Sequence, residues 1–205
     1  MMRKLLMIAS AIMFTTVGAH AATIDVTGRN GGDAVVNGGM ATFDVAGISG
    51  TIRAHSTAGV AGYPLITTSR HGLGVRNGPN DQAYDGSGNA VDGFGASDWL
   101  TVTFDTAVRF VSATLGTFTS GWFSWDQAAY SVDGGSYVRT NNATYSFGDV
   151  IASSFSVRAF GYSDDFTLSS FTVEAAPVPL PATALLLLGG LAGFGVLRRR
   201  KQQMA

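Results

Sequence analysis

Alternation of apolar and polar residues is the dominant pattern in the middle of the chain. The clearest example is Trp99 to Asp105 (WLTVTFD), in which Leu100, Val102 and Phe104 alternate with polar residues. A period of two is typical of a half-buried β-strand, so we expect these three side chains to face a core. Similar short runs recur between residues 22 and 174, and no stretch of ten residues there has the spacing of an amphipathic helix.

Turn signals separate these runs. The runs Ala41 to Val45 and Ile48 to Ala54 flank Gly47, which predicts a hairpin, and Asp133-Gly134-Gly135 predicts a tight turn. A further turn is expected at Asp105 to Ala107, where the alternation of the preceding run ends.

The last run, Asp165 to Glu174, changes phase between Leu168 and Phe171, which predicts a β-bulge around Ser169-Ser170. Ten to twelve short strands without a helix, spread over residues 22–176, are typical of an all-β domain. The expected fold class is therefore an antiparallel β-sandwich, jelly-roll-like, as an ectodomain between two terminal segments.

The first 21 residues have the layout of a secretory signal peptide. Arg3-Lys4 is followed by an apolar stretch from Leu5 to Val17 and then by Ala19-His20-Ala21. A positive region, a short apolar helix and a small-residue site predict cleavage after Ala21. An uncleaved N-terminal anchor is the alternative interpretation.

The C-terminal segment, residues 177–205, has three parts. Sixteen mostly apolar residues, 182–197, would form a helix about 24 Å long, which is short for a single membrane span. The other two parts are a proline motif and a basic tail, which would fix the end of the chain on the cytoplasmic side. The motif consists of Val178, Pro179, Leu180, Pro181 and Ala182, and the tail of Arg198, Arg199, Arg200 and Lys201.

This layout resembles the PEP-CTERM sorting signal in its VPLPA variant, which an exosortase reads. The segment lacks the Glu of the commoner Pro-Glu-Pro form, so an ordinary C-terminal anchor without processing is the alternative. The resemblance implies export through the inner membrane, transient anchoring there, and then a place at the cell surface or in the extracellular matrix. It also implies exosortase as a partner and an association with exopolysaccharide or biofilm.

The body of the chain is also similar in pattern to the jelly-roll ectodomains that precede such tails, and more loosely to galactose-binding-like sandwiches. The similar stretches are Gly72–Val75, Asp92–Gly95, Trp99–Phe104, Val132–Gly134 and Asp164–Leu168.

Charge and cysteine content narrow the classes of function. Although the whole chain has a net charge of −1, residues 22–176 hold 14 acidic side chains against seven arginines, a net charge of −7. An acidic exported domain is unsuited to nucleic acid. The chain has no cysteine, which excludes disulfides and zinc sites built from thiolates.

Catalytic motifs are missing from the sequence. Only His55 and His71 remain after the predicted signal peptide, and the chain contains neither H-E-x-x-H nor G-x-S-x-G. We therefore expect no catalytic residues, and no enzyme. A hydrolase of the surrounding matrix is the least favoured reading, since 13 aspartates make chance carboxylate pairs inevitable.

The acidic, glycine-rich stretch Asn77 to Ala96 is a candidate cation site. Carboxylate, hydroxyl and amide oxygens of the kind that calcium prefers occur at short spacing on Asp85, Ser87, Asn89 and Asp92. Position 96 is Ala where an EF-hand loop would end in Glu, so the stretch is not an EF-hand. A structural Ca²⁺ and a solvated turn cluster without metal are both open interpretations.

Aromatic residues crowd the second half of the chain. In the run Gly121 to Trp125, an extended backbone would direct Trp122 and Trp125 to opposite faces, one of which could bind a sugar ring. Burial in the core is the alternative. The leading hypothesis is a non-enzymatic surface or matrix protein, and the second is a carbohydrate-binding module that uses these aromatic side chains.

Overall fold

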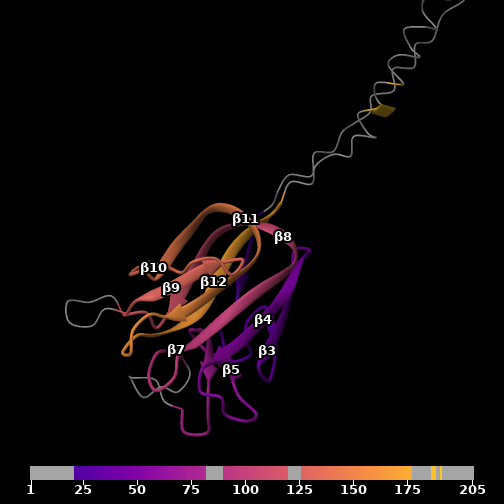
Figure 1. The fold of residues 1–205 in the computed structure, drawn as a ribbon. Helices are drawn as coiled ribbons and strands as arrows, with labels where there is room; N and C mark the ends of the chain where they lie inside the picture. The colour runs from indigo at the N-terminus through magenta and orange to yellow at the C-terminus, as the bar shows by residue number, and fades with distance from the viewer. Residues whose placement is uncertain (1–20, 82–89, 120–125, 177–185, 188–189, 191–205) are drawn as a thin grey trace, which may run out of the picture. The chain divides into compact units, whose positions relative to one another are not determined.

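The computed structural model describes residues 21–81, 90–119, 126–176, 186–187 and 190. The chain divides into two compact units, Met1–Ala175 and Ala176–Ala205. The strands of the first unit are antiparallel (Figure 1). They are β1 (Ala21–Asp25), β2 (Ala34–Asn37), β3 (Met40–Val45), β4 (Ile48–Ser56), β5 (Leu65–Ser69), β6 (Gly72–Arg76), β7 (Val91–Asp92), β8 (Asp98–Gly116), β9 (Ala128–Val132), β10 (Val138–Thr140), β11 (Thr144–Ala159) and β12 (Asp165–Ala175).

The long strand β8 joins the parts of the sheet. Its first half pairs with β4 and β11, and its second half pairs with β11 and β12. Since β12 also pairs with β1, while β4 continues through β3 to β2, the sheet curves into a nearly closed, barrel-like form. The predicted antiparallel all-β fold is confirmed, and the finer jelly-roll-like sandwich stays a prediction.

The alternating pattern identified the core face of β8 correctly. Leu100 and Val102 are fully buried and Phe104 is nearly so, whereas Thr101 is half-buried and Thr103 is exposed. The predicted hairpin of β3 and β4 is also confirmed, with the turn at its tip running from Val45 to Ile48. Its two central residues have positive φ angles, as the tightest hairpin turns require.

The turn predicted at Asp105 to Ala107 is wrong, because β8 continues through these residues. Instead, the pairing with β11 shifts register: Thr103 pairs with Ser154, but Val108 pairs with Ala152. Four residues of β8 therefore lie opposite a single residue of β11. Such an insertion bends a strand and increases its twist, which lets β8 contribute to both parts of the curved sheet.

The predicted bulge in β12 is confirmed. The register with β8 shifts between Leu168 and Ser170, so that Leu168 and Phe171 are both buried although three positions separate them. The carbonyl of the bulged Ser169 accepts a hydrogen bond of 2.9 Å from the backbone N–H of Val26, just after β1.

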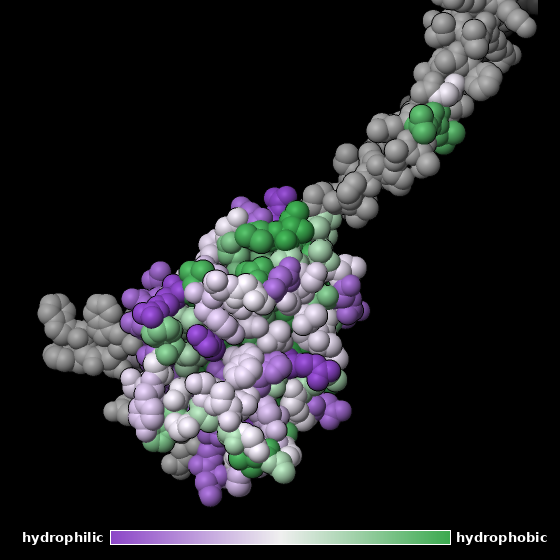
Figure 2. All heavy atoms as spheres, viewed as in Figure 1, coloured by the Kyte–Doolittle hydropathy of each residue, from purple (hydrophilic) through white to green (hydrophobic). Residues whose placement is uncertain are grey.

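Phenylalanine rings form the centre of the core. Phe171 meets Phe43 at 5.4 Å and Phe104 at 5.9 Å between ring centroids, both edge to face, and Phe110 meets Phe155 in the same way at 5.6 Å. Edge-to-face contacts add to the stability that burial of such rings provides. On the face drawn in Figure 2, hydrophobic residues form only small groups among neutral and hydrophilic ones.

The first and last strands, β1 and β12, lie side by side. Ala21, the last residue of the predicted signal peptide, pairs with Glu174 in β12, and Ala22, the first residue after the predicted cleavage site, pairs with Val173. The rest of the predicted signal peptide lies outside the described residues.

Little of the C-terminal unit is described. Leu186, Leu187 and Gly190, within the predicted membrane span, are helical. Among the described residues, no helix has the length and apolar character needed to cross a membrane. The proline motif and the basic tail lie outside the described residues.

Candidate metal centre

Three aspartates from neighbouring segments meet at one end of the sheet. Asp81 follows β6, Asp92 ends β7 and Asp98 begins β8. Each offers a carboxylate oxygen, and these oxygens all lie within 4.8 Å of one another. Asp92 and Asp98 are fully buried, whereas Asp81 is half-buried. We call these three residues the aspartate cluster.

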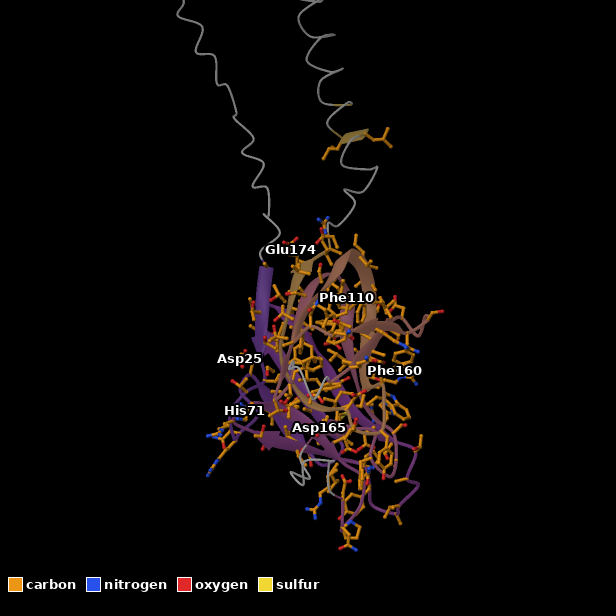
Figure 3. The ribbon with its side chains drawn as sticks, turned by 90° about the vertical axis from the view of Figure 1, so that its left-hand side faces the viewer. Asp25, His71, Phe110, Phe160, Asp165 and Glu174 are labelled. Carbon is orange, nitrogen blue, oxygen red and sulfur yellow. The ribbon has the colours of Figure 1, made fainter. Side chains whose placement is uncertain are left out.

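The short strand β7 is fixed where it pairs with the start of β12. Asp92 pairs with Asp165, which is labelled in Figure 3, and the N–H of Gly93 donates to the carbonyl of Asp164 at 3.3 Å. A Cβ atom at Gly93 would lie only 2.1 Å from the carbonyl oxygen of Gly161. Glycine at this position therefore lets the backbone beside Asp92 approach the loop before β12 closely.

Asn77 connects two members of the aspartate cluster. Its backbone N–H donates to Asp81 Oδ2 at 2.8 Å, and its side-chain Nδ2 donates to Asp98 Oδ2 at 3.1 Å. The N–H of Phe94 donates to Asp92 Oδ1 at 2.8 Å. The second oxygens of the two buried carboxylates, Asp92 Oδ2 and Asp98 Oδ1, have no hydrogen-bond partner among the described residues.

Burial changes the acidity of the two deepest members. It raises the pKa of Asp92 to about 8; the N–H of Phe94 acts in the opposite direction, and the charges of Asp98, Asp81 and Asp165 add to the rise. Burial likewise raises the pKa of Asp98 to about 6, although the side chains of Ser56 and Asn77 lower it. In the metal-free protein, a proton on Asp92 therefore relieves part of the charge repulsion at neutral pH.

A pocket of about 480 Å³ reaches one member of the cluster, Asp81. Asn77 and Asp81 line it together with Phe94 and the loop residues Gly78 to Asn80. Since Asp81 belongs both to the pocket wall and to the cluster, an ion or water entering the pocket meets this carboxylate first.

The structure brings together a different set of ligands from the set predicted on sequence. Of Asp85, Ser87, Asn89 and Asp92, only Asp92 is described, and it does lie in the cluster; the other three lie outside the described residues. The predicted loop from Asn77 to Ala96 also contains the strand β7, which the sequence analysis did not identify.

Asp81 and Asp98 were missed as site residues. Asp98 had a signal in the sequence, because it lies two positions before Leu100 and therefore on the same buried face as the apolar residues of β8. An acidic residue in phase with a core stripe is a candidate for a buried site. Asp81 had no such signal, since only the folding of the loop brings it to the others.

The remaining candidates are not brought into the cluster. His55 stacks on Trp99, with ring centroids 5.0 Å apart, and His71 Nε2 accepts a hydrogen bond of 2.7 Å from Arg70 Nε. Trp122 and Trp125, the predicted ligand face, lie outside the described residues, so this prediction stays open.

Comparison with known proteins identifies the end of the chain. A search of curated proteins finds no match. Residues 177–201 match the model of the PEP-CTERM protein-sorting motif. The matched residues include the proline motif and the basic tail from which the resemblance was inferred. The chain thus carries a PEP-CTERM protein-sorting motif at its C-terminal end, which implies an exported protein that an exosortase sorts to the cell surface.

Proposed function

We propose that this protein is a non-enzymatic component of the cell surface or extracellular matrix, where it associates with exopolysaccharide or biofilm. The observation that carries the proposal is the sorting motif at residues 177–201. An acidic strand-rich unit without cysteine agrees with a role outside the cell that does not depend on disulfides.

The finer details of sorting belong to the same proposal. We take Val178, Pro179, Leu180, Pro181 and Ala182 as a VPLPA variant of the motif, after which exosortase processes the tail. Before processing, the apolar residues 182–197 hold the chain in the inner membrane, with the basic tail on the cytoplasmic side. The exported part is then a jelly-roll-like sandwich, consistent with the curved antiparallel sheet.

Intact-mass analysis of the exported protein tests this proposal. In a strain with an active exosortase we expect a mature chain that lacks residues 183–205, and in an exosortase deletion strain we expect the tail to be retained in the membrane fraction. Pro179→Ala combined with Pro181→Ala should resemble the deletion. A mature C-terminus at Ala205 in the active strain would refute processing, and equal matrix levels in both strains would refute sorting.

A carbohydrate-binding module is the second candidate, and one observation favours it. Phe94 is 37% exposed and lines the pocket beside the aspartate cluster, and its ring lies 4.8 Å from that of Tyr162, which is 62% exposed. Exposed aromatic rings beside acidic and amide groups suit the apolar face and the hydroxyls of a sugar.

A glycan array and co-sedimentation with purified exopolysaccharide separate the two candidates. A module of this kind should bind a defined glycan, and Tyr162→Ala or Trp122→Ala with Trp125→Ala should weaken binding about tenfold. Val35→Ala, at an exposed position 71% accessible, is the matched control. Absence of any glycan signal would reject the module, whereas release of reducing sugar would indicate a hydrolase and contradict a non-enzymatic role.

A further inference from the structure

We propose that the aspartate cluster, Asp81, Asp92 and Asp98, binds a calcium ion that holds residues 77–81 after β6, the strand β7 and the start of β8 together. This site goes beyond the proposed surface function and does not depend on it. It also differs from the ligand set expected on sequence, with which it shares only Asp92.

The first argument is the state of the buried oxygens. Asp92 and Asp98 are fully buried, and each keeps one oxygen, Oδ2 and Oδ1 respectively, without a hydrogen-bond partner among the described residues. Buried carboxylate oxygens without partners are strongly destabilising, so native structures normally pair them or use them to bind metal. Two such oxygens in one cluster of three carboxylates indicate that a positively charged group binds between them.

Among the described residues, the arginine side chains do not supply this positive charge. Arg76, the arginine nearest in sequence to the cluster, donates instead to the carbonyls of Gly78 and Pro79. The ion pair found in the described part of the chain, Arg109 with Glu174, lies at the other end of β12, as the positions of Glu174 and Asp165 in Figure 3 show. The compensating charge must therefore come from a bound ion or a proton.

The ligand set selects the class of ion. The described cluster offers carboxylate oxygens and no histidine, which favours hard cations such as Ca²⁺ over zinc. Oxygens at most 4.8 Å apart fit around one Ca²⁺, whose opposite ligands are about 5 Å apart. Mg²⁺ requires opposite ligands at about 4.2 Å and retains more of its water, so it suits a buried three-carboxylate set less well.

The pocket can hold the water ligands that calcium needs in addition to the three carboxylates. Ca²⁺ takes about six to eight oxygen ligands, and three carboxylates provide at most six. The pocket lined by Asn77, Asp81 and Phe94 reaches the cluster at Asp81, so water in the pocket can add to the coordination there. Sites of this kind in extracellular modules bind calcium with Kd values of about 10⁻⁴ to 10⁻³ M.

The test is a thermal melt of the full chain in detergent, in EDTA, 10 mM CaCl₂ or 10 mM MgCl₂, with calcium titration calorimetry beside it. We expect calcium to raise the Tm by about 3–6 °C, with one ion bound per chain and a smaller effect of magnesium. Asp92→Asn and Asp98→Asn should lose this rise while melting in EDTA no lower than the wild type, because Asn keeps the side chain's shape and places no charge in the buried cluster.

Two further variants locate the ion. Asp44→Asn, at an exposed position on β3, should keep the full rise in Tm. Asp85→Asn tests the loop ligand set expected on sequence, and a rise that disappears there but persists in Asp92→Asn and Asp98→Asn would overturn the cluster as the site. If either cluster variant fails to give a cooperative melt, Asp81→Asn, at the half-buried member, provides the same comparison. No shift and no heat in the wild type would end the proposal, and equal responses to the two metals would refute calcium as the ion.

Discussion

At the scale of single residues, Asp92 links acidity to stability. Its folded pKa of about 8 lies above the ordinary value of 3.8, so the folded state binds more protons than the unfolded state between these pH values. The stabilisation from this proton is fully present below about pH 4 and disappears as the pH rises through 8. Burial of the carboxyl is the main cause of this raised pKa; the N–H of Phe94 lowers it, and the carboxylates of Asp98, Asp81 and Asp165 add to the rise.

The prediction is a pH dependence of the metal-free protein. In EDTA, the Tm of the wild type should fall between pH 5 and pH 8, whereas Asp92→Asn, which cannot ionise, should show a clearly smaller fall. A pH series of calorimetric melts measures both slopes, with Asp44→Asn as the control that should follow the wild type. Parallel slopes for Asp92→Asn and the wild type would contradict the assignment of the raised pKa to this residue.

A second prediction concerns the aromatic core. Phe104 is 4% exposed and contacts Phe43, Phe110 and Phe171, so Phe104→Ala should lower the free energy of unfolding by about 3–5 kcal/mol. Thr103→Ala, at the neighbouring exposed position, should change it by less than about 0.5 kcal/mol. Urea denaturation measures the difference, and equal effects of the two changes would contradict the burial phase of β8.

For single residues, the sequence predicted burial correctly where burial depends only on the residue's position in its own strand. The alternation around Leu100 predicted burial correctly because a strand directs every second residue to the same face. The aspartate cluster could not be predicted in the same way, because Asp81, Asp92 and Asp98 lie on separate segments that come together only in the folded chain. The sequence places acidic residues in this region, but it does not say which of them meet.

At the scale of elements, the close approach of β4 and β8 depends on Gly50. A Cβ atom there would lie 2.2 Å from the carbonyl oxygen of Thr103 and 2.7 Å from the ring of Phe43. We predict that Gly50→Ala lowers the free energy of unfolding by about 1–3 kcal/mol, because strand and ring must both shift. Gly78→Ala, where the nearest atom is 3.8 Å away, is the matched control. Urea titrations with equal midpoints for the two variants would show that this contact tolerates a side chain.

The pairing of β8 with β11 also shows why the sequence predicted a turn inside β8. Asp105, Thr106 and Ala107 interrupt the alternation, and in a sequence an interruption of this length reads as a turn. In the structure the same residues are the extra ones in a bulge opposite β11. A bulge and a turn have similar local patterns, and only the pairing partners on both sides distinguish them.

At the scale of the whole molecule, sorting and metal binding are predicted to be independent. The aspartate cluster adjoins the first residues of β12, and the tail continues from its last residue, Ala175. Replacing Arg198, Arg199, Arg200 and Lys201 with neutral residues should weaken retention of the tail on the cytoplasmic side. The same change should leave the calcium-dependent shift in Tm unaltered, as melts beside protease-accessibility assays would show. A lost shift would indicate coupling between the two ends.

The sequence alone could predict some features of the whole molecule better than others. The sorting tail could be read directly because its proline motif, apolar run and basic end are contiguous. The curved, nearly closed sheet could be predicted only as antiparallel and all-β, since its closure depends on pairings such as β4 with β8 and β1 with β12, which join distant parts of the chain.

The pairing of Ala21 with Glu174 has a mechanical consequence. Residues 170–174 of β12 lie between β8 and β1, and the hydrogen bonds of antiparallel strands are perpendicular to the strand direction. A pull along the strand from its C-terminal end therefore strains the bonds to both neighbours together instead of opening them one at a time. A pull on that end therefore loads these hydrogen bonds in shear.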